Sequence, residues 1–177
     1  MKIDALPEGA GHDQLCFRAV HALEDVRQVA ALAADIWREY YVPLIGATQV
    51  EYMLEKFQNA AAMLEQIQRG DEYFMICGAA RLLGYLAVRA NPDQSMFISK
   101  LYLQRDLRGA GTGRRALQFI EQLALERGLN LLWLTVNKLN PAVNAYEKCG
   151  FQIAASIRID IGEGFVMDDF RMEKRLV

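Results

Sequence analysis

A run of alternating glycines between an apolar segment and a helix-forming segment limits what this chain can become more than any other feature. Residues 101–115 are LYLQRDLRGAGTGRR, with glycines at 109, 111 and 113. Glycine lets the backbone adopt a positive φ and approach a ligand closely. The first N–H groups of a helix have no partners within the helix and point toward whatever lies at its start. The sequence therefore predicts a strand–turn–helix unit that binds an anion, most naturally a phosphate.

The charges around this turn agree with an anion site. Arg105, Arg108, Arg114 and Arg115 face only Asp106 in the local sequence, an excess of 4 − 1 = +3. The whole chain, with 20 basic and 22 acidic residues, has a net charge of −2. A cation near a helix N-terminus is disfavoured by about 0.3–1 kcal/mol, and a bound anion would remove that penalty. A solvated basic loop is the alternative interpretation.

Two other phosphate-binding motifs fit the turn poorly. A P-loop needs a lysine after its last glycine, and none follows here. The spacing Gly111-x-Gly113-x-x-Ala116 does match a dinucleotide fingerprint. However, the next expected strand, residues 131–136, ends at Asn137 and not at the carboxylate that a ribose needs. A nucleotide-binding regulator is therefore the weakest of the hypotheses.

Apolar periodicity along the chain predicts an α/β (α+β) fold, a mixed sheet of about six to seven strands flanked by about four helices. Thr48, with Glu51 three residues later, is the expected capping box of the second helix. Strands are expected at residues 15–20, 72–77, 83–89, 96–103, 131–136, 151–161 and 165–173. Helices are expected at residues 24–40, from 48 onward, at 113–127 and at 141–148, with a further short one at 60–68.

Length and composition fit one domain. The chain has 177 residues, of which 53% are hydrophobic and 24% charged, so we expect a flexible leader over residues 1–14 and one domain over 15–177. The acidic net charge disfavours nucleic acid and membrane surfaces as partners. Three cysteines without CxxC spacing argue against a disulfide framework or a metal site, and they favour a cytoplasmic location.

Residues 108–113 read Arg-x-x-Gly-x-Gly, and residues 135–151 read TVNKLNPAVNAYEKCGF. Together they resemble two motifs of the GNAT superfamily of acetyl-CoA-dependent N-acetyltransferases, the Arg/Gln-x-x-Gly-x-Gly/Ala turn and the Asn…Ala…Tyr-Glu-Lys-x-Gly-Phe signature. The resemblance extends from about residue 15 to the C-terminus. It implies a sheet that splays at the cofactor site, acetyl-CoA as co-substrate, and direct transfer of an acetyl group to a primary amine of a small molecule or a protein.

The resemblance also implies which residues hold the cofactor. The backbone of the strand that enters the turn, Leu101, Tyr102 and Leu103, would pair with the pantetheine arm. Asn140 would contact the pantetheine, although it is one residue closer to Tyr146 than is usual in the family, so Asn137 and Asn144 are alternatives. The turn amides would hold the diphosphate; these residues are Arg108, Gly109, Ala110, Gly111, Thr112, Gly113 and Arg114.

Tyr146 is the residue that the resemblance assigns to protonation of the leaving thiolate. A tyrosine at this place in Tyr-x-x-x-Gly-Phe could instead only cover the core. Only the first role needs the hydroxyl group. The sequence does not decide between the two roles.

The proton acceptor is less clear. Many relatives carry a glutamate on the strand before the glycine turn, but residues 96–103 contain no Asp or Glu. Alternation along Val166, Asp168, Phe170 and Met172 places Asp168 on the apolar face of a strand, where a carboxylate is costly unless it is paired or used. We therefore predict Asp168 as a catalytic carboxylate. Ordered water in place of a base, and a wet strand end, are the alternatives.

The acceptor and the assembly are the least determined features. Acidic residues such as Glu39, Glu51 and Asp160 would suit a cationic amine, or they simply form a solvated surface. The missing strand carboxylate keeps open a catalytically silent CoA-binding sensor or partner module. A sheet edge at the C-terminus is compatible with a homodimer.

Overall fold

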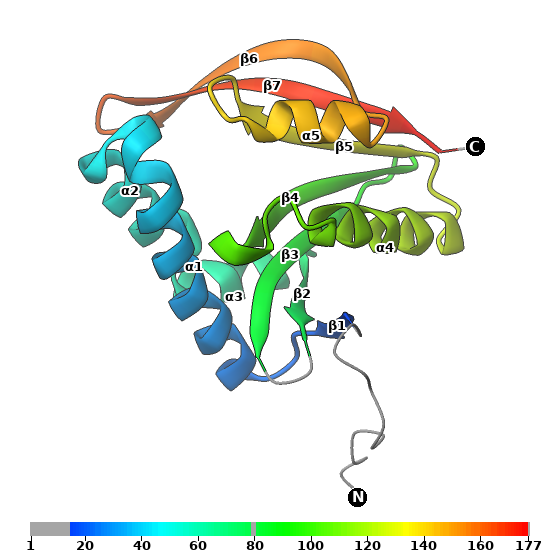
Figure 1. Cartoon of the computed structure of the whole chain (residues 1–177), viewed down its shortest axis with the longest axis horizontal. Helices are drawn as coiled ribbons and strands as arrows, with labels where there is room; N and C mark the ends of the chain where they lie inside the picture. Colours follow the sequence, from blue (N-terminus) through cyan, green and yellow to red (C-terminus); the bar gives the residue numbers. More distant parts are fainter. Residues whose placement is uncertain (1–14, 79–80, 177) are drawn as a thin grey trace, which may run out of the picture.

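The computed structural model describes residues 15–78 and 81–176, and within them seven strands form one sheet (Figure 1). Their spatial order is β1-β2-β3-β4-β5-β7-β6. Only β4 and β5 pair in parallel among these strands. The expected leader, residues 1–14, lies outside the described residues. The strands are β1 (Cys16–Ala19), β2 (Glu72–Cys77), β3 (Leu82–Ala90), β4 (Ser95–Leu103), β5 (Leu131–Asn137), β6 (Gln152–Gly162) and β7 (Phe165–Arg175).

Five α-helices lie in the described residues, so the predicted mixed α/β fold is confirmed. A short π-helical turn, Leu54–Gln58, follows the second helix, and a short 3₁₀ turn, Arg105–Leu107, precedes the fourth. The helices are α1 (Leu23–Ile45), α2 (Ala47–Met53), α3 (Ala60–Gln68), α4 (Thr112–Glu126) and α5 (Ala142–Lys148).

The helices cover the two faces of the sheet, and each face has its own core. The helices α1, α2 and α3 pack on one face, around Trp37, Met63 and Tyr85. The helices α4 and α5 pack on the other face, around Ile120 and Leu132. In Figure 1 the β5–β7–β6 part of the sheet, with α5, lifts away from the β1–β4 part. The molecule is thus built as two halves that meet along β4 and β5.

The first two helices differ from the sequence prediction at their junction. Periodicity ends α1 at Tyr40, whereas the helix continues to Ile45 and Gly46 ends it with a φ of +83°. The next helix begins at Ala47, so the capping box expected from Thr48 is wrong. Glu51 instead pairs with Arg38 of α1, at 2.7 Å between Nε and Oε1. Gly46 therefore separates the two helices, and Glu51 links α2 to α1 and does not cap α2.

The cysteines are free thiols, although Cys16 on β1 lies directly opposite Cys77 on β2. None of the described helices combines the length and the apolar character that a membrane crossing requires. The described residues also contain no group of three or more His, Cys, Asp or Glu side chains placed to hold a metal ion.

Candidate active site

The strands β4 and β5 pair over only four residues and then separate. Their last partners are Ile98 and Leu134. At the same point the register between β3 and β4 shifts, because Val88 faces Ile98 while Ala87 faces Lys100. Such a bulge increases the local twist and bends a strand. Beyond it, β4 follows β3 and β5 follows β7, so the sheet opens between its two central strands as the resemblance implied.

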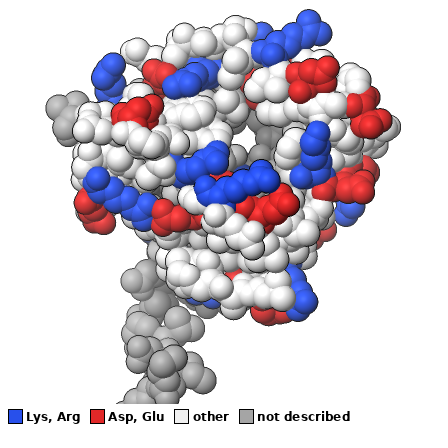
Figure 2. All heavy atoms as spheres, turned by 180° about the vertical axis from the view of Figure 1, so that it is seen from behind, with Lys and Arg blue, Asp and Glu red and all other residues white. Residues whose placement is uncertain are grey.

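A cleft of about 1240 Å³ occupies this opening. It reaches from the glycine turn to α3 and is lined by residues of both halves of the molecule. Figure 2 shows a hollow near the middle of one face, with basic side chains beside it and acidic ones interspersed over the rest of that face. Most of the predicted cofactor residues line the cleft: Leu101, Tyr102, Leu103, Arg108, Gly109, Gly111, Gly113, Arg114 and Asn140. The side chains of Ala110 and Thr112 do not, and Thr112 is buried.

The backbone of the turn borders the cleft at its three glycines. Gly109 and Gly111 have φ values of +79° and +86°, which side chains with a Cβ rarely adopt. Gly111 is the N-cap of α4, and its carbonyl accepts the N–H of Arg115 at 3.1 Å. The N–H groups of residues 112–114 precede that bond, so the helix itself gives them no partner. A Cβ at either glycine would meet nothing within 4 Å, so the space beside the turn is open. An open cradle of amides at a helix start fits a diphosphate.

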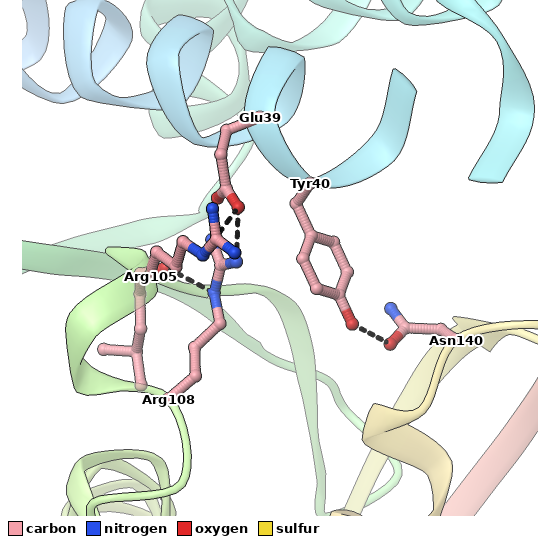
Figure 3. A network of polar contacts seen from close by, with 6 residues as sticks. Glu39, Tyr40, Arg105, Arg108 and Asn140 are labelled. Atoms are coloured by element: carbon pink, nitrogen blue, oxygen red, sulfur yellow. Dashed lines mark hydrogen bonds and ion pairs between the residues drawn. The ribbon is translucent and has the colours of Figure 1, made fainter. Parts of the chain in front are cut away.

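The basic side chains of the turn are partly neutralised by α1 (Figure 3). Arg108 donates from Nη2 to Glu39 Oε2 at 2.7 Å and from Nη1 to Oε1 at 3.2 Å. Its Nε donates to the carbonyl of Leu103 at 3.1 Å. Arg105 Nε lies 3.9 Å from the same carboxylate. The net positive charge around the turn is therefore smaller in the folded protein than the local sequence indicates, because Glu39 approaches from α1.

Asn140 already binds protein groups at the edge of the cleft. It is 5% exposed, and its Oδ1 accepts from the Tyr40 hydroxyl at 2.8 Å and from the Ala142 N–H at 2.9 Å (Figure 3). Its Nδ2 donates to the Tyr41 hydroxyl at 3.3 Å. Asn140 thus joins α1 to the start of α5, and a contact with a cofactor would come in addition to these bonds. Of the two alternatives, Asn137 lines the cleft and Asn144 does not.

Tyr146 both packs on the core and lines the cleft, so its position is compatible with each of the two roles that the sequence left open. The residue lies on α5, lines the cleft and packs edge to face against Phe151, with 5.8 Å between ring centroids. Burial raises the pKa of Tyr146 to about 12, and charges at Tyr40 and Cys149 act in the same direction. The hydroxyl group therefore stays protonated at neutral pH, as a proton donor must.

Asp168 lies outside the cleft, so the expected inward placement of this side chain is wrong. Its side chain is 56% exposed and forms an ion pair with Lys138. It shares a face of β7 with Phe170 and Met172, as the alternation predicted, and those two residues do pack in the core. The core ends before Asp168, however, and that face is open to solvent at this position.

Asp169 is the carboxylate that sequence reasoning missed. It lines the cleft, is 5% exposed and lies opposite Asn137 of β5. Burial raises the pKa of Asp169 to about 6, against a hydrogen bond from Thr135 that lowers it. Alternation shows that two adjacent aspartates on a strand point to opposite faces, but it does not show which face leads to a cleft. The pairing of β7 with the splayed end of β5 decides that, and the pairing is not readable from a single sequence.

The far end of the cleft, under α3, is polar. Lys100 is 7% exposed and donates to Gln66 Oε1 at 2.7 Å. Burial lowers the pKa of Lys100 to about 8, and the charge of Asp71 opposes that shift. Arg89 lies 3.4 Å from Asp71. The acidic Glu39 and Glu51, expected to favour a cationic acceptor, are instead engaged in ion pairs with arginines.

Comparisons with known proteins agree with this architecture. The family model described as "Acetyltransferase (GNAT) family" matches residues 29–151. An uncharacterized N-acetyltransferase of Mycobacterium tuberculosis is 24% identical over 88% of this chain and all of its own length. Streptothricin acetyltransferase of Streptomyces lavendulae is 36% identical over 44% of this chain and 43% of its own length. The crystal structure of the PaiA N-acetyltransferase from Thermoplasma acidophilum in complex with coenzyme A has a TM-score of 0.77, with 19% identity over 93% of this chain and all of that one.

Proposed function

Because the chain belongs to the acetyltransferase (GNAT) family, we propose that it transfers an acetyl group from acetyl-CoA to a primary amine. One observation carries the proposal: the cleft opened by the split of β4 from β5 begins at a turn of unpartnered helix amides. An elongated ligand with an anionic group at one end and a polar, amide-bearing arm fits such a cleft. Coenzyme A has this form, and a related fold has been solved with it.

Two sets of free main-chain groups, those of the glycine turn and those on the edge of β4, indicate which residues would hold the cofactor. The amides of the glycine turn, residues 109–114, would bind the diphosphate. The edge of β4 that faces the cleft, Leu101–Leu103, pairs with β3 on its other side only. Its free main-chain groups would pair with the amides of the pantetheine arm, as a strand is extended by an added peptide. Arg114, which lines the cleft at the same turn, would add positive charge.

Tyr146 is the residue that we assign to the leaving group. Acetyl-CoA supplies the acetyl group as a thioester, and its sulfur must gain a proton when it leaves. The support for Tyr146 is its place on the cleft wall and its protonated hydroxyl. The acceptor amine would enter from the side of α1 and β7, where Tyr40, Tyr41 and Met167 line the cleft.

The test is thiol release from acetyl-CoA with a panel of amines. The panel contains a polyamine, a lysine-containing peptide, a free amino acid and streptothricin, the last chosen because a relative is named for it. We expect release of free CoA that depends on at least one amine, together with an acetylated product of the matching mass. Stabilisation by CoA without turnover for any amine would instead support the sensor hypothesis. The absence of both would overturn the assignment of the cleft to this cofactor.

A further inference from the structure

We propose that Asp169 accepts the proton of the acceptor amine, which makes it a catalytic residue on β7. This inference rests on the proposed function and goes beyond it, because the acetyl transfer itself leaves the identity of the base open. The strand before the glycine turn carries no carboxylate, so a carboxylate that serves as the base has to come from elsewhere in the cleft.

Among the described residues, three carboxylates line the cleft, and Asp169 is the one that forms no ion pair. Glu65 lies 3.4 Å from Arg69, and Asp71 lies 3.4 Å from Arg89. No ion pair is found for Asp169 in the described part of the chain, although its side chain is almost fully buried. A buried carboxylate without a cation is costly to keep charged, which favours a use for it.

Asp169 and Tyr146 line the same cleft, together with Tyr41 and Tyr102. Burial raises the pKa values of both Tyr41 and Tyr102, and charges at Asp169 and Tyr146 raise them further. Tyr146 comes from α5 and Asp169 from β7, so a proton donor and a proton acceptor face one chamber from two different elements.

The surroundings of Asp169 bring the pKa of its carboxyl group close to the pH at which a general base works. Besides burial, the charge of Asp168 raises its pKa, while the Thr135 hydrogen bond and the charge of Lys138 lower it. On the other elements, Tyr41 and Tyr102 interact electrostatically with it and are neutral, and Ile157 of β6 lies beside it. With a pKa of about 6, the carboxylate is ionised at pH 7.5 and is a stronger base than an ordinary aspartate, so it can accept a proton.

The proton balance of the reaction is then complete. The ammonium form of the acceptor gives one proton to the Asp169 carboxylate, which later releases it to water. The neutral nitrogen forms a bond to the thioester carbon, and the carbon–sulfur bond breaks. The sulfur gains a proton from the Tyr146 hydroxyl group. The nitrogen loses its second proton as the amide forms, and this proton returns to Tyr146. The sum is one amide, one thiol and one proton.

The experiment compares Asp169→Asn with Asp168→Asn. The two neighbours lie on opposite faces of β7, Asp169 buried in the cleft and Asp168 exposed beside Lys138, so the second variant controls for the loss of one negative charge outside the cleft. Both are assayed at saturating acetyl-CoA, from pH 5 to 9.5, with an amine that the wild type acetylates. Stabilisation by CoA establishes that each variant is folded.

For Asp169→Asn we expect kcat to fall about 100-fold with CoA affinity unchanged. The fall of wild-type activity below a pH near 6 should be absent from the variant, and its deficit should shrink as the pH approaches the pKa of the amine. Asp168→Asn should keep both kcat and the acidic limb. Asp169→Glu should recover part of the activity.

Wild-type kcat and an unchanged acidic limb in Asp169→Asn would overturn the proposal while acetyl transfer stands. Loss of activity in Asp168→Asn with retention in Asp169→Asn would overturn it in favour of the expectation from sequence alternation. If the wild type released no thiol with any amine, the proposed function itself would fail, which is a different outcome from either.

Discussion

The two walls of the cleft, the cofactor wall and the acceptor wall, differ in whether main-chain groups or side chains are proposed to act there. On the proposed cofactor wall, β4, the glycine turn and α4 are consecutive in the chain, and the groups proposed to bind the ligand belong to the main chain. On the proposed acceptor wall, α1, β5, α5 and β7 meet from distant parts of the chain, and the groups proposed to act are side chains. A site made of backbone amides depends on a few glycines, whereas a site made of side chains depends on how strands pair.

The largest expected effect is on the cofactor wall. Gly111→Asp should weaken CoA binding by roughly 100-fold or more, because the new carboxylate enters the amide cradle and a positive φ is lost. Gly128→Asp is the matched control, since Gly128 has a φ of +71°, open space around its Cβ position and a place at the other end of α4. Isothermal titration calorimetry with CoA measures both.

Equal losses in the two glycine variants would mean that strain in α4, and not the cradle, is responsible. Unchanged affinity in Gly111→Asp would mean that the cofactor wall lies elsewhere.

A smaller effect is expected from the acceptor wall, where one hydroxyl group is removed. Tyr146→Phe should lower kcat by about 10- to 100-fold and leave CoA affinity nearly unchanged, because the ring still packs on Phe151 while the proton donor is gone. Steady-state kinetics together with calorimetry separates the two quantities. If turnover is untouched, Tyr146 serves packing alone.

The smallest effect is one of stability, and it has the opposite sign from the loss of activity. The folded pKa of Asp169, about 6, lies above its ordinary value of 3.8, so its contribution to stability is present at low pH and is lost as the pH rises through 6. At pH 7.5 we expect Asp169→Asn to be more stable than the wild type by about 1–2 kcal/mol, with no gain at pH 4. Urea unfolding at the two pH values checks this, and a destabilised variant at pH 7.5 would contradict it.

The sequence predicted the strand–turn–helix unit beside the cleft well because its signals are local. The strand, the positive-φ glycines and the helix of residues 95–126 follow one another closely. The sequence did not show the partner of Arg108, because Glu39 approaches from α1, nor that Ala110 and Thr112 do not line the cleft. The family and the fold were also predicted from the two motifs. On the acceptor wall, alternation alone cannot say where a core ends, so it chose Asp168 where the structure buries Asp169.

The proposed function requires that main-chain nitrogens of the glycine turn hold the diphosphate of coenzyme A. Amide chemical-shift changes of the ¹⁵N-labelled protein, titrated with CoA and then with pantetheine, test it most directly because pantetheine lacks the diphosphate. We expect large shifts of the Gly109, Gly111 and Gly113 amides with CoA and small ones with pantetheine. Shifts of the β4 and α5 amides with CoA, while those three glycines stay in place, would contradict it.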